Sequence, residues 1–216
     1  MAEYLVIRLP ENRGDAASWI AVDSSGTRIG APETGPLELA AHGAADREVI
    51  ALVPAAGVLS MSVDIPIKRG PRLLAALPFA LEEQLADDVE NLHFAAGIRR
   101  EDGRLPVAVV ARHLMDGWIA DLQGAGISPV RVVPENHGLA RIPGTLSALV
   151  AENRVMFNDG DDEEFVLQDV KPSDALALAG VLDDQRDDSK ETSQHLLVYC
   201  EPPDEQRFEH DWTALR

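Results

Sequence analysis

The stretch RLLAALPFALEEQLADDVENLHFA, residues 72–95, decides how the sequence around it is interpreted. Residues 69–86 have a helical composition, and leucines recur every four positions from Leu73 to Leu85. Pro78 interrupts this pattern because it cannot donate a hydrogen bond to the carbonyl of Leu74. We therefore expect a kinked helix, or two short helices that meet at Pro78, followed by a strand at 92–99.

Strands are predicted on the N-terminal side of this stretch. Residues 4–9 and 18–22 are rich in β-forming residues, and the turn 23–26 leads into a short third run at 27–31. These segments indicate an antiparallel meander of three strands. A helical turn at 36–42 and two strands, at 47–53 and 57–63, are expected next.

A strand–helix–strand pattern is predicted on the C-terminal side. The helix at 113–124 lies between strands at 105–111 and 127–133, and it ends at Gly124 and Gly126. Its apolar face contains Leu114, Met115, Trp118, Ile119 and Leu122. Two strands joined through a helix usually pair in parallel by a right-handed crossover, so we expect the two flanking strands to be parallel neighbours.

The last part of the chain repeats the order of elements of the first part. Three further strands, a helix and a fourth strand are predicted at 146–151, 154–158, 164–168, 173–182 and 195–200, with a solvated loop at 183–191. Both parts thus begin with a three-strand meander and continue into a helix and a strand. The sequence predicts an α/β protein built from two similar halves.

Charge and composition exclude several classes of function. The formal net charge is −18, and residues 151–216 contain 18 acids and 6 bases. A surface this acidic repels phosphate backbones and anionic lipid, so we expect no nucleic-acid partner, whereas a basic protein partner is compatible. The longest uncharged run, 49–63, contains proline and glycine and is too short to span a membrane. The single cysteine, Cys200, excludes an internal disulfide.

No residue set for catalysis, metal or cofactor is recognisable. None of the lysines follows a glycine, and neither a Gly-x-Gly-x-x-Gly fingerprint nor a Gly-x-Ser-x-Gly elbow occurs. The histidines lack metal-ligand spacing, and the acidic run 159–164 has its glycine in the wrong place for a calcium loop. We therefore expect no catalytic site, no metal and no cofactor.

One resemblance is far more specific than these patterns. The stretch 72–95, together with 52–55 and 64–66, resembles the cytoplasmic domain of the type II secretion system protein L family. The family resemblance implies an actin-like, RNase-H-like α/β fold of two lobes. We expect the first lobe at 1–143, with an inserted subdomain around 33–100, and the second at 144–216.

The same resemblance implies an adaptor function. Members of this family dock the N-terminal domain of the secretion ATPase, protein E, at the inner membrane, and platform proteins M and F are further expected partners. A second copy of the chain, in a homodimer, is a further possible partner. The resemblance also implies that a transmembrane helix follows Arg216, so that this soluble fragment belongs to the cytoplasmic face of the inner membrane.

Two alternatives from other classes remain: a nucleotide-dependent actin-like ATPase and a self-assembling cytoskeletal protein. Actin-like ATPases bind nucleotide through Asp-x-Gly loops, in which aspartate acts on magnesium and glycine lets amides approach phosphate. No aspartate of this chain is followed by x-Gly. The first equivalent turn is Pro10-Glu11-Asn12-Arg13-Gly14, and the second contains Glu152-Asn153. We expect a fold without nucleotide chemistry.

The candidate site residues fall into two sets. An acidic turn and a strand at a sheet edge could receive the ATPase, because an edge offers unpaired backbone groups; this set is Asp159, Asp161, Asp162, Glu163, Glu164, Phe165 and Leu167. The motif residues are expected to be structural, with the leucines and Phe79 in a core around the helix and the acids on a solvated face. This second set is Leu73, Leu77, Pro78, Phe79, Leu81, Glu82, Glu83, Gln84, Leu85, Asp87 and Asp88.

Overall fold

The structure, a computed structural model, describes residues 3–66, 70–151, 154–160, 164–179, 195–200 and 202–214. The chain divides into two compact units, Met1–Glu135 and Asn136–Arg216. The expected lobe boundary at 143–144 lies inside the second unit, just before its first strand.

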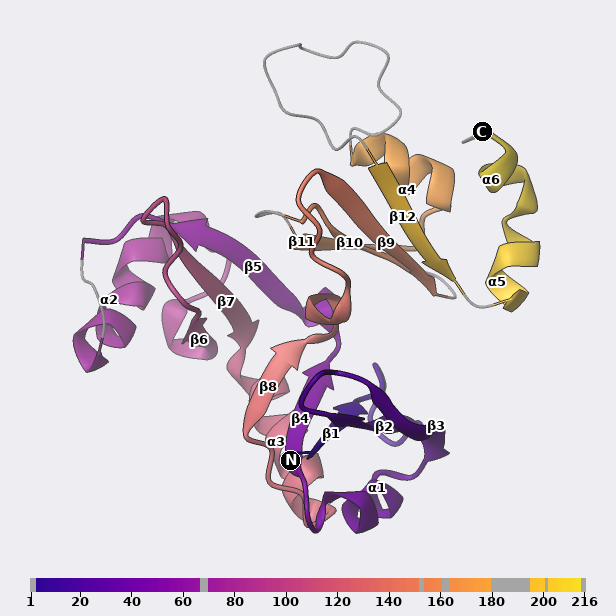
Figure 1. The fold of residues 1–216 in the computed structure, drawn as a ribbon. Coiled ribbons are helices and arrows are strands. Elements are labelled where there is room, and N and C mark those ends of the chain that lie inside the picture. The colour runs from indigo at the N-terminus through magenta and orange to yellow at the C-terminus, as the bar shows by residue number, and fades with distance from the viewer. Residues whose placement is uncertain are drawn as a thin grey trace. The chain divides into compact units, whose positions relative to one another are not determined.

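The first unit is built on a five-stranded mixed sheet with the strand order β3-β2-β1-β4-β8 (Figure 1). β1, β2 and β3 form the antiparallel meander, and β4 and β8 extend the sheet in parallel from β1. Two helices, α1 and α3, belong to this layer. The bounds are β1 Glu3–Arg8, β2 Ala17–Asp23, β3 Arg28–Gly35, α1 Leu37–Ala44, β4 Glu48–Val53, α3 Arg112–Gly124 and β8 Arg131–Pro134.

Alternation along the strands produces the core of this sheet. Side chains two residues apart lie on one face of a strand, and Leu5, Ile7, Val49 and Ala51 are all buried in one cluster. The same cluster contains Ala40 of α1 and Leu122 of α3, so both helices cover that face. α3 ends where Gly126 takes a positive φ of 76°, and the amide of Ile127 donates to the carbonyl of Leu122.

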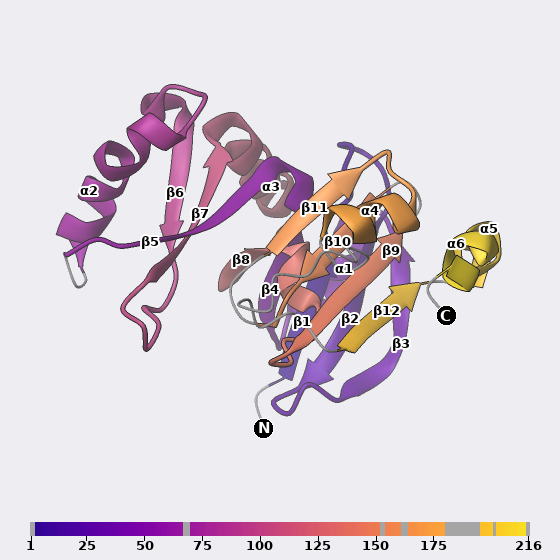
Figure 2. The same ribbon diagram turned by 90° about the horizontal axis from the view of Figure 1, so that it is seen from above.

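A three-stranded antiparallel sheet with the order β5-β7-β6 is inserted between β4 and α3. In Figure 2, α2 lies along this sheet. Leu73, Leu77 and Leu81 of α2 are buried in one cluster with residues of β6 and β7. The bounds are β5 Val58–Val63, α2 Pro71–Leu81, β6 Leu92–Ala96 and β7 Leu105–Ala111, with short 3-10 helices η1 Ala55–Gly57, η2 Glu82–Gln84 and η3 Val89–Asn91.

The second unit contains a four-stranded sheet with the order β11-β10-β9-β12. β9, β10 and β11 are antiparallel, and β12 pairs in parallel with β9. Its core includes Phe157 and Leu176. The bounds are η4 Glu135–Gly138, β9 Thr145–Ala151, β10 Arg154–Asn158, β11 Glu164–Gln168, α4 Pro172–Leu178, β12 His195–Cys200, α5 Pro202–Arg207 and α6 Glu209–Ala214.

The predicted repeat agrees with these connections. In each unit a three-strand meander is followed by a helix and by a strand that pairs in parallel with the first strand of the meander. The solvated loop expected at 183–191 lies outside the residues that the structure describes.

Two other expectations differ from the structure. β7 and β8 do not pair; β8 joins β4 in the first sheet, because α3 returns the chain from the inserted sheet to the main one. The inserted subdomain was expected around 33–100, but the inserted sheet β5-β7-β6 spans Val58–Ala111. β4 pairs with β1 and therefore belongs to the five-stranded sheet. Of the two forms expected around Pro78, the structure has a single helix that contains the proline, not two helices that meet there.

Candidate docking surfaces

β11 is an edge strand, as expected. It pairs with β10 alone in the sheet order, so its other side has no strand partner within the described part of the chain. Such an edge presents a row of backbone N–H and C=O groups to a partner.

Phe165 and Leu167 of β11 were expected to contact a partner, but their side chains pack on the core of the second unit. Phe165 stacks on Phe157 with their ring centroids 4.8 Å apart, and Leu167 packs against the same core. Both residues therefore contribute to the stability of the second unit, and neither offers an exposed apolar anchor. Asp159 is half-buried, and the other candidates of the turn, Asp161, Asp162 and Glu163, lie outside the described residues.

Glu164 belongs to a cluster inside the second unit rather than to an acidic rim. Its side chain is only 7% exposed, it forms an ion pair with Arg141, and its Oε2 lies 2.8 Å from Nε2 of His137. Burial lowers the pKa of His137, and the positive charge of Arg141 lowers it further. The imidazole is therefore neutral at neutral pH, and Arg141 supplies the charge that balances Glu164.

The turn before β11 depends on a glycine. Gly160 has a φ of +85°, and a Cβ at this position would collide with the backbone carbonyl of Ile142. The amide of Gly160 donates to Oδ1 of Asn158 over 2.9 Å. These contacts hold Gly160 against the backbone of Ile142, directly after the end of β10.

The motif on α2 has a buried face and an exposed face. Leu73, Leu77 and Leu81 are buried, as expected, and Leu85 is half-buried against the same cluster. The expectation for Phe79 was wrong: its side chain is 77% exposed. Pro78 is half-buried, and the remaining motif residues, Glu82, Glu83, Gln84, Asp87 and Asp88, are exposed.

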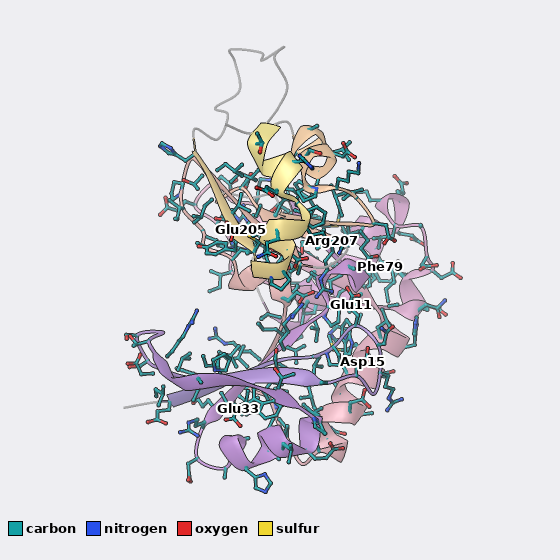
Figure 3. The ribbon with its side chains drawn as sticks, turned by 90° about the vertical axis from the view of Figure 1, so that its right-hand side faces the viewer. Glu11, Asp15, Glu33, Phe79, Glu205 and Arg207 are labelled. Atoms are coloured by element: carbon teal, nitrogen blue, oxygen red, sulfur yellow. The ribbon has the colours of Figure 1, made fainter. Side chains whose placement is uncertain are left out.

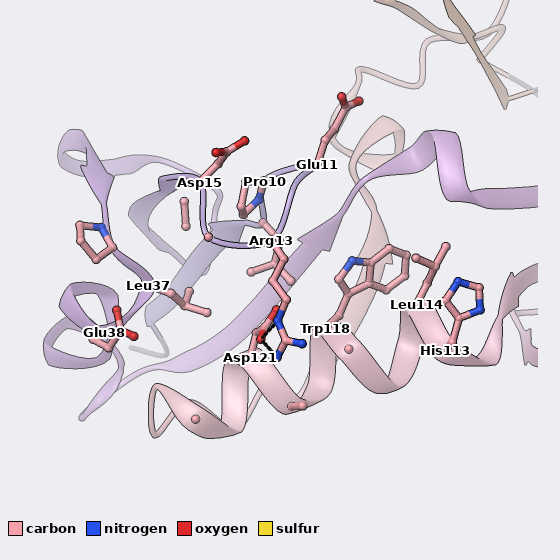
Figure 4. A pocket seen from close by; sticks show the side chains of 17 residues that line it. Pro10, Glu11, Arg13, Asp15, Leu37, Glu38, His113, Leu114, Trp118 and Asp121 are labelled. Atoms are coloured by element: carbon pink, nitrogen blue, oxygen red, sulfur yellow. Dashed lines mark hydrogen bonds and ion pairs between the residues drawn. The ribbon is translucent and has the colours of Figure 1, made fainter.

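A groove of about 650 Å³ in the first unit was not predicted (Figure 4). It lies between the β1–β2 turn, the beginning of α1 and one face of α3. Its apolar lining includes Leu9, Leu37, Leu114 and Trp118. A signal was available in the sequence, because Gly117 and Gly124 are seven residues apart and therefore share one face of the helix.

An ion pair spans this groove. The Nε of Arg13, on the β1–β2 turn, donates to Oδ1 of Asp121 on α3 over 2.8 Å, and a second guanidinium nitrogen contacts the same oxygen (Figure 4). The side chains of Arg13 and Asp121 are 72% and 31% exposed. The pair is therefore accessible to solvent and adds little to stability.

Within the described residues, no group of three or more His, Cys, Asp or Glu side chains could hold a metal ion. His195 and Cys200 are both on β12, and burial raises the pKa of the Cys200 thiol, as do the nearby charges of Glu205 and Asp204. The described helices are all too short or too polar to cross a membrane.

Similarity to solved structures shows the fold. The cytoplasmic domain of EpsL, an inner membrane component of the type II secretion system of Vibrio cholerae, matches with a TM-score of 0.69 and 20% identity over 99% of this chain and 95% of that one. A protein from Bacteroides thetaiotaomicron with an actin-like ATPase fold and unknown function matches with a TM-score of 0.56 and 10% identity over 98% and 87% of the two chains. The fold is thus actin-like.

Similarity to curated sequences shows the family. The type II secretion system protein L of Dickeya chrysanthemi is 31% identical over 158 residues, which are 72% of this chain and 39% of that protein. The protein L of Pseudomonas aeruginosa is 43% identical over 77 residues, 36% of this chain and 20% of that protein. This chain thus matches well under half the length of these relatives. The family model for type II secretion system protein L matches residues 5–215, and the chain belongs to this family.

Proposed function

We propose that this chain is a non-catalytic adaptor that docks the N-terminal domain of the secretion ATPase, protein E, and links it to the inner-membrane platform. Membership of the protein L family supports a role as a component of the secretion system. The observation that supports this docking site is the position of β11 at the edge of its sheet, within the part of the chain that the structure describes. Because Phe165 and Leu167 pack inward, the edge would bind chiefly through its backbone, by addition of a strand from the ATPase.

Acidic residues before β11 would act mainly on the rate of association. The last part of the chain holds most of the net negative charge, and Asp161, Asp162 and Glu163 directly precede the edge strand. Charges at the rim of an interface steer a partner of opposite charge and make its association sensitive to salt. Glu164 is excluded from this role by its ion pair with Arg141.

The geometry of the β1–β2 turn disfavours the alternative of a nucleotide-dependent ATPase. Pro10 has no backbone N–H to offer a phosphate, and the carboxylates of Glu11 and Asp15 stand on the same turn (Figure 3). Arg13 is already engaged by Asp121. We expect no stabilisation by ATP and magnesium in a thermal-shift assay; a ligand at 100 times its Kd would add about 2.7 kcal/mol, which this assay resolves easily.

Other contacts follow from the same proposal. Platform proteins M and F are proposed partners, and the chain is proposed to act at the cytoplasmic face of the inner membrane. A self-assembling protein is the remaining alternative, and light scattering at high concentration would reveal its filaments.

Association kinetics with the N-terminal domain of the ATPase test the docking site. The variant Asp161→Ser/Asp162→Asn/Glu163→Ser removes the acids before β11 and leaves Glu164 in place. A control, Glu82→Gln/Glu83→Gln/Asp87→Asn, makes the same charge change on exposed residues of the first unit. We expect the first variant alone to slow association and to flatten its salt dependence, while each single acid contributes only about 0–1 kcal/mol.

Two results would argue against the proposed site. Equal slowing by both variants would mean that net charge, not the turn, steers the ATPase. Unchanged kinetics in both would move the docking site away from β11, and the exposed Phe79 and Leu74 of α2 would be examined next.

A further inference from the structure

The groove of the first unit has the dimensions of a binding site. Its volume of about 650 Å³ falls within the roughly 300–1,000 Å³ that ligand sites usually have. Leu9, Leu37, Leu114 and Trp118 give it apolar walls (Figure 4). The groove lies wholly within the first unit, whereas β11 belongs to the second.

Beside Leu114, Trp118 and Asp121, the α3 face of the groove contains three small residues. Gly117 and Gly124 line it, and a Cβ built on either glycine meets no other atom within 4 Å. Ala120 lies between them on the same helix. A helix face composed of such small residues lets the main chain of another segment approach closely. An extended peptide therefore fits this face better than a bulky rigid ligand.

The charges around the groove select the occupant. Four carboxylates line it, from Glu11, Asp15, Glu38 and Asp121, against the one permanent cation of Arg13. This excess of negative charge disfavours phosphates and acidic peptides and favours a basic side chain. Arg13, donated by the β1–β2 turn to Asp121, already shows how a guanidinium binds there.

We propose that this groove binds an extended segment of a partner protein in which an arginine or lysine stands next to an apolar side chain. The cation of the segment takes the place of Arg13 on Asp121, and its apolar side chain packs on Trp118 and Leu114. Arg13 is then an internal competitor, which leaves Asp121 when the segment binds. This inference goes beyond the docking of the ATPase at β11 and does not depend on it.

The test uses a defined probe, the peptide Gly-Ser-Leu-Arg-Leu-Ser-Gly, titrated into the isotopically labelled chain and followed by NMR. Two counterparts carry glutamate in place of arginine, or serine in place of both leucines. We expect the first peptide alone to shift the amide signals of Gly14, Gly117 and Gly124. Neither counterpart supplies both the cation and the apolar contact, so neither should bind at the groove.

Variants of the groove separate binding from folding. Gly117→Leu fills the open space and also raises helix propensity, so it should abolish binding in a protein at least as stable as the natural one. The matched control Gln123→Leu adds a leucine to an exposed position of α3 outside the groove and should leave binding unchanged.

If Arg13 competes with the peptide for Asp121, removing Arg13 should raise the affinity for the peptide, whereas removing a purely structural ion pair should not. Arg13→Ala should tighten binding by about two- to fivefold, the range expected when an exposed ion pair no longer competes. Asp121→Asn should weaken it. The proposal is overturned if the leucine–arginine peptide shifts none of the groove signals in either the natural chain or Arg13→Ala, if binding survives Gly117→Leu, or if Arg13→Ala weakens it.

Discussion

Replacing Leu77 by alanine should strongly destabilise the first unit. Leu77 is completely buried between α2 and the β5-β7-β6 sheet, in a cluster with Leu73 and Leu81. The substitution removes three carbon atoms from a packed site and leaves a cavity, which usually costs about 2–5 kcal/mol. A loss of about 3 kcal/mol would lower the melting temperature by roughly 6–12 °C for a chain of this size.

Phe79, two residues further along the same helix, provides the matched control. Its side chain is 77% exposed, so Phe79→Ala removes few packing contacts, and alanine has the higher helix propensity. We expect the free energy of unfolding to change by no more than about 0.5 kcal/mol. Both variants would be followed by urea unfolding with circular dichroism and by calorimetry.

The comparison of the two variants can refute the packing of α2. If Leu77→Ala changed stability by less than about 0.5 kcal/mol, the helix would not pack on the sheet as described. If Phe79→Ala were as damaging as Leu77→Ala, Phe79 would also be packed in a core, which would contradict its exposure on α2.

Three further predictions concern single groups. The pKa of His137 is lower in the folded state, so the unfolded state binds the proton first, and the stability of the protein should fall as the pH drops below about 6.5. In this pH range the melting temperature of the natural chain should fall more than that of His137→Asn. Gly160→Ala should cost more than Gly26→Ala in thermal denaturation, since both glycines have positive φ but only a Cβ at Gly160 meets backbone, and equal costs would contradict this. The thiol of Cys200 should react slowly with a disulfide reagent at mildly alkaline pH, because its pKa is raised; a rate equal to that of free cysteine would contradict the burial.

The exposure of Phe79 could have been predicted from the sequence but was not. Each residue of an α-helix turns by about 100°, so Phe79 is about 200° from Leu77 and cannot share its face. The recurrence of leucines every four residues correctly indicated the buried face. Phe79 was assigned to the core only because it is apolar, although the helical period places it on the face opposite to Leu77.

Pro78 illustrates a local rule that the surroundings modified. Its missing N–H leaves the carbonyl of Leu74 without a helical donor, which favoured either a kinked helix or two short helices. Leu74 is 51% exposed, so water can reach this part of α2, and the helix continues to Leu81.

Contacts between distant residues explain the remaining differences. The ion pair of Glu164 with Arg141 turns an apparent rim acid into an internal group, and nothing in the order of the residues indicates that the two meet. In the same way β8 follows α3 in the sequence but pairs with β4. The repeat of meander, helix and strand was predictable because it depends on short-range patterns.

The proposed docking of the secretion ATPase is tested most directly by calorimetric titration of its N-terminal domain into this chain, at low and at high salt, with and without ATP and magnesium. We expect saturable, equimolar binding that weakens as the salt concentration rises and that is unaffected by the addition of nucleotide to this chain alone before titration. An absence of binding at any salt concentration, or binding that requires this chain to be loaded with nucleotide, would contradict it.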